Sequence, residues 1–484
     1  MTKPLGIAAL VIYYLGLAAA GVQRHLWHDE LYTFYIAQAP SLSQLWQDLR
    51  LDLNPPLGYL LARAAMQLFG NSAFAVRLPS MAGVLTGSLC LYALVSRRLR
   101  PSYGLLAVLI FWSTPALYFA TEARPYGLVL GFFGLAMLCW QRAGDSPRPA
   151  WAVPTLAFAV TGMMLSHFFA VFFLVPFLLA EFIRLIRLRR PDWPISAALL
   201  LPGVLPFFFL HIQTGDAFPP AFQASLRKMA SYYYWTLHPE GWVILLGLCI
   251  ALALRRSGAE SRAQAEVPSH TERAFVVGLL ALPISVNIAM MLTHGAFFTR
   301  YAAPTLFAYP LVLVFLLATS RGSALAMCGL LALYIPIQNL AKARPQALNI
   351  AHVHPELPLV AASGLTFLEM DHYEPPETVD RLYYLTGREH ALQYAHATLF
   401  EGLPAIKQHF PIRARVEAFR DFAQSHPRFL VLGTPDYPED WLLRYLLAIH
   451  AKVEFLGEFP SEYKDSQMFV AEMPGRWENT RPER

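Results

Sequence analysis

Long apolar runs alternate with short polar stretches over about the first 340 residues, and the later residues follow the pattern of a soluble domain. A bilayer core of roughly 30 Å is crossed by about 20 apolar residues in a helix. Eleven runs approach that length and are predicted to be transmembrane helices, at residues 5–22, 78–95, 103–120, 126–140, 151–166, 168–186, 196–213, 241–254, 274–293, 302–319 and 323–340. The predicted fold class is a polytopic α-helical membrane protein with a C-terminal α/β domain.

The chain is predicted to divide into a membrane domain, residues 1–344, and a soluble domain, residues 345–484. Within the first, residues 24–77 form an outward loop that is expected to contain amphipathic helices. In the second, the runs Pro358–Ser363 and Phe429–Gly433 have the character of buried strands. Helical spacing over Trp441–Ala451 precedes a third strand-like run, and such alternation is typical of βα units.

Lys and Arg in the loops predict the orientation, because cytoplasmic loops carry an excess of them. One set of loops, with the N-terminus, is rich in these residues: Lys3, Arg97, Arg98, Arg100, Arg142, Arg148, Arg184, Arg187, Arg189, Arg190, Arg255, Arg256, Arg262, Arg273 and Arg321. The opposite set has fewer over more residues: Arg24, Arg50, Arg63, Arg77, Arg124, Arg227, Lys228 and Arg300. The N-terminus is therefore predicted to be cytoplasmic. An odd number of spans then makes the C-terminal domain extracytoplasmic.

Composition supports a membrane protein and gives no sign of a metal framework. Hydrophobic residues make up 56% of the chain and charged residues 15%, against about 45–50% and about 25% in soluble domains. The four cysteines each lie alone in an apolar run, so neither disulfides nor a structural zinc site is expected. No glycine-rich nucleotide loop is present.

The strongest candidate for chemistry is His28-Asp29-Glu30, which follows the first apolar run almost at once. Ionisable groups at a membrane boundary are costly to desolvate and are by default a functional-site hypothesis. Two adjacent carboxylates at this depth could hold a catalytic base where a lipid-linked substrate meets water.

Six short motifs stand out along the membrane part: Trp27-His28-Asp29-Glu30, Asn54-Pro55-Pro56-Leu57, Phe69-Gly70, Arg77-Leu78-Pro79-Ser80, Thr121-Glu122-Ala123-Arg124-Pro125-Tyr126 and Phe298-Thr299-Arg300-Tyr301. They resemble motifs of GT-C glycosyltransferases, and more narrowly of glycosyltransferase family 39, the group of protein O-mannosyltransferases and the aminoarabinose lipid A transferase. The resemblance covers roughly residues 5–340.

The resemblance implies that a sugar moves from a polyprenyl monophosphate to an acceptor outside the membrane, with inversion at the anomeric carbon. It carries the role of base over to Asp29, with Glu30 as its neighbour. It also implies a bacterial inner-membrane location. Asn54 departs from the pattern, because relatives often have His or Lys there. An asparagine supplies no charge, so the phosphate contact must come from elsewhere.

The same chemistry follows from the residue types. Inverting transfer needs a base on the acceptor hydroxyl and a stabilised leaving phosphate. Glu30 could orient the acceptor, pair with an arginine, or hold a divalent cation with Asp29, and no other cofactor is expected. Arginine suits bidentate phosphate contact, and Arg124 and Arg300 stand at outward ends of predicted spans. The candidate substrate-binding residues are His28, Asn54, Glu122, Arg124, Tyr126, His167, Arg300 and Tyr301.

Each candidate has a structural alternative. Asp29 and Glu30 could be solvated or cap a helix, and Arg124 could pair with Glu122 or reach the interface. Arg300 beside Tyr301 also fits an interfacial anchor. A lone histidine such as His167 is more often structural than ligand-binding.

Two rival functions remain open at this point. A transporter or flippase of lipid-linked sugars would use the same cations without a base, but no internal repeat of the transporter kind is visible. A non-catalytic assembly subunit would make Asp29 dispensable. The expected partners are the polyprenyl-phosphate-linked sugar, an acceptor that could be protein, lipid A or polysaccharide, and the bilayer, with no nucleic acid.

Overall fold

The computed structural model describes residues 3–52, 54–209, 218–237, 268–317, 321–340, 350–434, 437–459 and 467–475. The chain divides into two compact units. The helical unit consists of Met1–Gln23, Ala37–His211 and Ala224–Ala343, and the α/β unit of Arg24–Ile36, Ile212–Gln223 and Arg344–Arg484. The first outward loop predicted at residues 24–77 is thus shared between the units.

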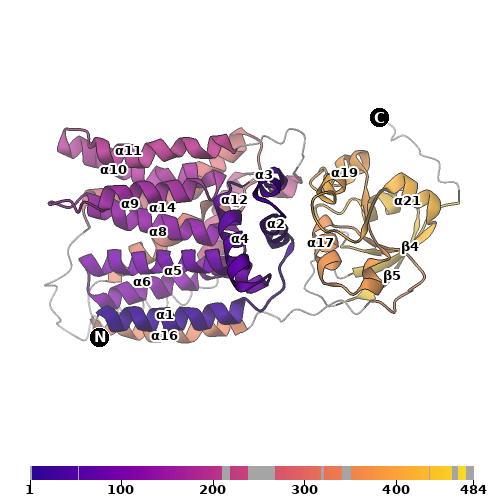
Figure 1. Ribbon diagram of the computed structural model, residues 1–484, viewed down its shortest axis with the longest axis horizontal. Coiled ribbons are helices and arrows are strands. Elements are labelled where there is room, and N and C mark those ends of the chain that lie inside the picture. Colours follow the sequence, from indigo (N-terminus) through magenta and orange to yellow (C-terminus); the bar gives the residue numbers. More distant parts are fainter. Residues whose placement is uncertain are drawn as a thin grey trace. The chain divides into compact units, whose positions relative to one another are not determined.

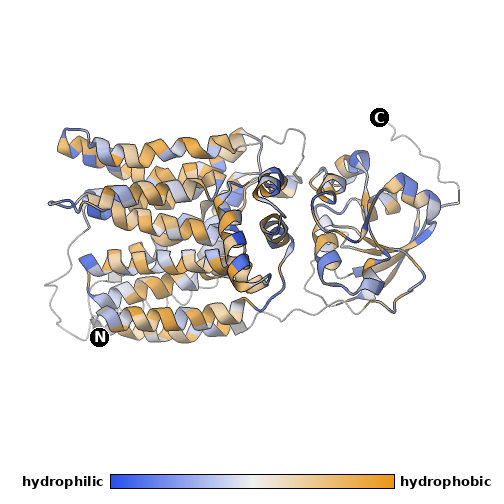
Figure 2. Cartoon of the chain, in the orientation of Figure 1, coloured by the Kyte–Doolittle hydropathy of each residue, from blue (hydrophilic) through white to orange (hydrophobic). Residues whose placement is uncertain are grey.

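The helical unit is a bundle of mainly apolar helices, as the hydropathy colours of Figure 2 show. Five described helices are long and apolar enough to cross a membrane: Pro4–Gly21, Ala73–Arg98, Pro125–Ala143, Phe168–Leu188 and His270–Leu292. The elements of the unit are α1 (Lys3–Gly21), α3 (Leu42–Asp48), η1 (Leu49–Leu51), α4 (Leu57–Phe69), α5 (Ala73–Arg98), α6 (Pro101–Ser113), α7 (Ala116–Ala120), α8 (Pro125–Ala143), α9 (Ala152–Met164), η2 (Phe168–Leu174), α10 (Val175–Leu188), α11 (Trp193–Leu200), η3 (Leu201–Phe208), α12 (Leu226–Leu237), α14 (His270–Leu292), η5 (Thr299–Phe307), α15 (Ala308–Leu317) and α16 (Arg321–Leu340).

Ten of the eleven predicted spans overlap these helices, and the eighth, residues 241–254, lies outside the described residues. Several spans differ from a single α-helix. The span at residues 103–120 consists of α6 and α7, which are separated at Thr114-Pro115. Proline lacks an N–H and cannot continue a helical ladder without a break. The predicted multi-pass α-helical fold is confirmed.

Glycines let the two central helices α5 and α8 cross closely, and Figure 1 shows them side by side. A Cβ on Gly83 would lie 2.3 Å from the Gly127 carbonyl oxygen, and one on Gly131 would lie 2.6 Å from the Gly83 Cα. Small residues four apart permit such backbone approach between membrane helices. The remaining core is apolar and includes the fully buried Trp112.

The α/β unit contains a six-stranded sheet in the order β3-β2-β1-β4-β6-β5. Strands β1 to β4 run parallel where they pair, and β6 is antiparallel to both β4 and β5. Its elements are α2 (His28–Ala37), η4 (Pro220–Phe222), β1 (Leu359–Ala361), α17 (Gly364–Tyr373), α18 (Pro376–Val379), β2 (Leu382–Thr386), α19 (Arg388–Tyr394), α20 (Leu403–Ile406), β3 (Arg415–Ala418), α21 (Phe419–Ser425), β4 (Arg428–Leu432), α22 (Leu442–Ala448), β5 (Lys452–Glu458) and β6 (Gln467–Glu472). The predicted C-terminal α/β fold is confirmed.

Candidate functional site

The two carboxylates of the first loop lie in the first turn of α2 and have different surroundings. Glu30 is fully buried, and its Oε2 lies 2.8 Å from Arg24 Nη1. The same oxygen accepts a hydrogen bond from the Trp27 N–H. Glu30 is therefore engaged in holding the chain before α2, which is the arginine pairing considered from sequence.

Asp29 has a histidine as its neighbour. Its Oδ1 lies 2.7 Å from His28 Nε2, and the two side chains keep 14% and 13% of their surface exposed. A neutral imidazole with its proton on Nε2 donates to this carboxylate and orients it. The contact fixes the geometry of the Asp29 carboxylate, which keeps only a small exposed fraction, and a fixed geometry suits a general base.

In the helical unit, five predicted residues come together at one end of the bundle: Arg124, Tyr126, His167, Arg300 and Tyr301, here called the arginine cluster. The Arg300 guanidinium lies 5.8 Å from the Tyr126 ring centroid. The His167 ring lies 5.0 Å from that of Tyr126 and 6.2 Å from that of Tyr301. Residues far apart in sequence therefore form one cationic and aromatic patch.

The members of the cluster lie at the N-terminal starts of helices. Arg124 is the extended residue before α8, and Pro125 takes the first helical position, where its missing N–H costs no bond. His167 is the N-cap residue before η2, and Arg300 lies in the first turn of η5. Because Arg124 stands at the start of the long helix α8, the macrodipole of that helix adds partial positive charge to that of the guanidinium group.

His167 is held neutral. Its Nδ1 accepts a hydrogen bond of 3.1 Å from the Phe169 N–H, so the ring proton is assigned to Nε2. Burial, and then the positive charges of Arg124 and Arg300, lower the pKa of His167 to about 3. A neutral His167 adds a hydrogen-bond donor to the patch and no charge.

Sequence reasoning missed Asp52, which is the carboxylate paired with Arg124. Its Oδ2 lies 2.5 Å from Arg124 Nη1 and accepts a second hydrogen bond of 2.7 Å from the Tyr59 hydroxyl. Both members of the pair are nearly buried. The available signal in the sequence was that Asp52 is a single acid between two leucines, just before the motif that begins at Asn54.

Two other predicted residues lie near this pair. Asn54 is buried and donates a hydrogen bond of 3.2 Å to the Asp52 carbonyl oxygen, so it shapes the loop that presents the carboxylate. Glu122 is also buried, two residues before Arg124. Arg124 itself forms an ion pair with Asp52.

Carboxylate, histidine and thiolate side chains are common protein ligands of metal ions. Among the described residues, no three or more such side chains are close enough together to hold an ion. Asp29 and Glu30 turn to different partners, Glu30 to Arg24 and Asp29 to His28.

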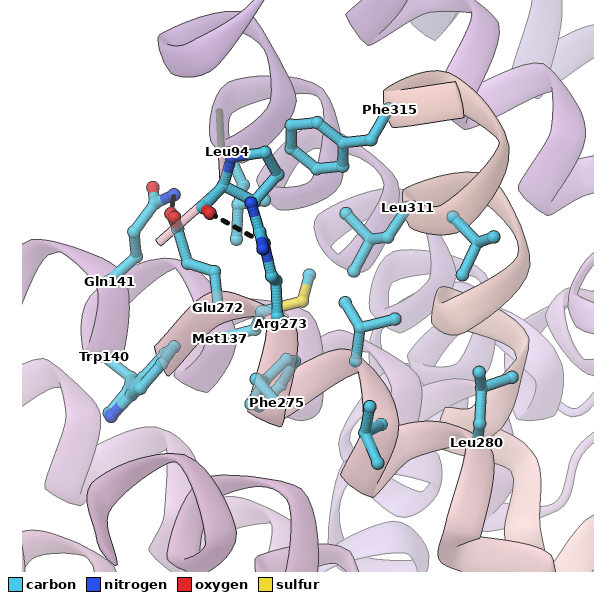
Figure 3. A pocket seen from close by; sticks show the side chains of 14 residues that line it. Leu94, Met137, Trp140, Gln141, Glu272, Arg273, Phe275, Leu280, Leu311 and Phe315 are labelled. Carbon is cyan, nitrogen blue, oxygen red and sulfur yellow. Dashed lines mark hydrogen bonds between the residues drawn. The ribbon is translucent and has the colours of Figure 1, made fainter. Parts of the chain in front are cut away.

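The apolar cavities of the helical unit lie apart from these residues. Figure 3 shows one of about 320 Å³ whose walls include Met137, Phe275 and Phe315 from α8, α14 and α15. A second, of about 440 Å³, runs along α4 and α5 past Phe69 and Gly83. Neither is lined by a predicted site residue, and the walls of the first also include Gln141, Glu272 and Arg273.

Comparison with known proteins finds a family model that matches part of the chain. Residues 53–210, about one third of the 484, match the family model described as dolichyl-phosphate-mannose-protein mannosyltransferase. This segment includes Asn54, Glu122, Arg124, Tyr126 and His167. The resemblance to the GT-C glycosyltransferase group is confirmed.

Two solved structures are similar over most of their length. ArnT from Cupriavidus metallidurans in the apo state has 12% sequence identity and a TM-score of 0.45, with 96% of this chain and 97% of that chain covered. The same protein bound to undecaprenyl phosphate has 14% identity and a TM-score of 0.43, with the same coverage. No curated protein sequence matches the chain.

Proposed function

We propose that this chain is an integral-membrane glycosyltransferase that moves a sugar from a polyprenyl-monophosphate donor to an acceptor on the extracytoplasmic side, with inversion. The observation that carries the proposal is the arginine cluster, in which Arg300 lies 5.8 Å from the Tyr126 ring and the buried His167 lies beside the rings of Tyr126 and Tyr301. The family match supports the choice of donor, because its description names a polyprenyl-phosphate sugar and a transfer reaction.

The cluster suits the phosphate of a lipid-linked donor. Guanidinium groups bind phosphate oxygens with directed, often bidentate, hydrogen bonds. Arg124 and Arg300 are at the ends of apolar helices, where a lipid phosphate would meet them while its isoprenoid chain stays in the bilayer. Asp52 offsets part of the charge of Arg124 in the absence of a ligand. Tyr126 and Tyr301 offer aromatic faces for a sugar ring.

Asp29 would act as the base. Its carboxylate takes the proton of the acceptor hydroxyl while the hydroxyl oxygen forms a bond to the anomeric carbon. The bond between that carbon and the phosphate oxygen breaks, and both of its electrons leave with polyprenyl phosphate. Arg124 and Arg300 stabilise the negative charge that the phosphate gains. The neutral His167 can donate a further hydrogen bond to it.

The proposal includes a topology. The arginine-rich loops are cytoplasmic, and Asp29, the arginine cluster and residues 345–484 are extracytoplasmic, in a bacterial inner membrane. Residues 1–344 form the domain that binds the donor, and the C-terminal domain contributes on the acceptor side.

The test is sugar transfer in proteoliposomes that contain the full chain and one donor from a panel of polyprenyl-phosphate sugars. Wild-type protein should release polyprenyl phosphate with one donor, and Asp29→Asn should bind that donor without turnover. Asp380→Asn, which changes an exposed carboxyl group elsewhere in the α/β unit, serves as the control with normal turnover.

Other outcomes separate the alternatives. Wild-type turnover in Asp29→Asn would remove the base assignment and make Glu30 the next candidate. A donor that crosses the bilayer unchanged would replace the enzyme by a transporter. Turnover lost to a chelator and restored by a divalent cation would add a metal to the reaction.

A further inference from the structure

The segment that carries Asp29 is hydrogen-bonded to one helix of the C-terminal domain, α17. The residues Arg24–Ile36 belong to the α/β unit, not to the helical unit that surrounds them in sequence. Within that unit, the His28 N–H donates a hydrogen bond of 2.9 Å to Glu369 Oε1, and the Leu26 N–H donates one of 2.6 Å to the Tyr373 hydroxyl. Both acceptors are on α17.

The other end of the segment is held as well. The Tyr35 hydroxyl and His372 Nδ1 share a hydrogen bond of 2.7 Å. The Phe410 ring lies 5.3 Å from the Tyr32 ring and 5.1 Å from the Tyr35 ring. The first and third turns of α2 are therefore fixed by separate contacts, which define its position and its rotation.

The helix that makes most of these contacts, α17, is fixed by its own cap and packing. α17 follows the central strand β1 directly, and Ser363 caps it by accepting a hydrogen bond from the Leu365 N–H. Phe367 and Leu368, on the helix itself, are buried. Glu369, His372 and Tyr373 are three and four residues apart, so they share one face of the helix.

Glu369 has the most direct connection to Asp29. Its carboxylate accepts the first N–H of α2, where negative charge also interacts favourably with the helix macrodipole. The residue that donates this N–H, His28, contacts Asp29 through its side chain and precedes it in the chain. A shift of the first turn would therefore move the carboxylate of Asp29 and its histidine partner together.

We propose that α17 of the C-terminal domain positions the catalytic base, with Glu369 and Tyr373 as positioning residues for Asp29. The inference rests on the proposed function, and it assigns the C-terminal domain a part in catalysis. Displacing a reacting group by about 1 Å can cost about a hundredfold in rate. Donor binding depends on Arg124 and Arg300, which α17 does not contain.

The experiment compares the full-length wild type with Glu369→Ala and Glu369→Gln in proteoliposomes. For each protein, kcat and KM for the donor are measured, and hydrogen exchange of the α2 amides is followed by mass spectrometry. Glu369→Ala should increase α2 exchange and lower kcat by about tenfold or more, with KM within about twofold. Glu369→Gln keeps an acceptor for the His28 N–H and should restore both kcat and exchange towards wild type.

Two further variants are included, one to test a second contact and one as a control. Tyr373→Phe removes the acceptor for the Leu26 N–H and keeps the ring that stacks on His25 at 4.0 Å, so it should give a smaller loss of the same kind in a folded protein. Glu377→Ala changes an exposed acid just beyond α17 and should leave all three quantities unchanged.

Three results would overturn the inference: Glu369→Ala with increased α2 exchange and normal kcat, Glu369→Ala with unchanged exchange, or a loss that falls on KM alone. A Glu369→Gln protein as slow as Glu369→Ala would remove the hydrogen-bond account. A wild-type protein that transfers no sugar would refute the proposed function. If its α2 amides are protected from exchange, α2 is still docked on α17, so the two failures can be told apart.

Discussion

The pair between Asp52 and Arg124 offers a quantitative test of the arginine cluster. Asp52→Asn removes one negative charge and keeps an oxygen that can accept the hydrogen bond of Tyr59. The pair is short, at 2.5 Å, and Asp52 and Arg124 keep only 11% and 8% of their side-chain surfaces exposed. The substitution therefore leaves the positive charge of Arg124 in a site that water screens poorly.

Its magnitude follows from that burial. Breaking a buried ion pair by removing one partner costs about 3–5 kcal/mol. The remaining exposure of both groups puts Asp52→Asn near the lower end, at about 3 kcal/mol of unfolding free energy. The donor should respond in the opposite direction, because the full charge of Arg124 becomes available to its phosphate, and KM should fall about threefold to tenfold.

The assay is equilibrium unfolding in mixed micelles, together with donor KM in proteoliposomes. Asp145→Asn is the matched control, because its ion pair with Arg97 is more exposed, at 28% and 22%, and should cost about 1 kcal/mol or less. The double variant Asp52→Asn/Arg124→Gln should be more stable than the sum of the single effects predicts, by about 1 kcal/mol or more. Additive single effects would refute the pairing as a source of stability, and an unchanged KM would separate Arg124 from the phosphate.

Further predictions concern packing, acid sensitivity and donor binding. Gly83→Ala should destabilise the helical unit by about 1–3 kcal/mol, because its Cβ would lie 2.3 Å from the Gly127 carbonyl oxygen, whereas Gly16→Ala, with no atom within 4 Å, should have little effect on the unfolding midpoint. Burial, followed by nearby positive charge, lowers the pKa of His372 to about 4, while an unfolded histidine has a pKa of about 6.5. The unfolded state therefore binds more protons between these values, and thermal unfolding temperature should fall from about pH 6.5 to about pH 4, less steeply in His372→Gln. Arg300→Gln should raise donor KM about tenfold or more with the fold intact, and an unchanged KM would exclude it from the phosphate contact.

The helices could be predicted because each apolar run is long enough to be detected locally. Breaks within a span were not predicted. At Thr114-Pro115, for example, the apolar run continues but the helical hydrogen bonds are interrupted. In the C-terminal domain, the runs around β1 and β4 are fully buried and were recognised. The outer strands β3 and β5 consist of exposed and half-buried residues, so they show no apolar run. Their formation depends on pairing with other strands of the sheet. The strands β2, β3 and β6 were not predicted, and only Val453–Phe455 of β5 was recognised.

The sequence suggested candidate site residues, but it did not show which side chains contact one another. Motifs identified Asp29, Arg124 and Arg300, because charge in an apolar setting stands out. Asp52 was missed because its importance comes from a contact with Arg124, 72 residues later. The association of Arg24–Ile36 with the C-terminal unit was also invisible, because backbone N–H donors and side chains such as Glu369 carry no distinctive pattern.

The membership of α2 in the α/β unit has a consequence for how this chain can be shortened. A protein cut after residue 344 would keep every predicted transmembrane run, together with the whole segment of the family match. It would nevertheless lose Glu369, His372, Tyr373 and Phe410, which are the surface on which α2 rests. The exposed face of α2 would then include Tyr32 and Tyr35, so such a truncation would be prone to self-association and unsuitable as a minimal version of the protein.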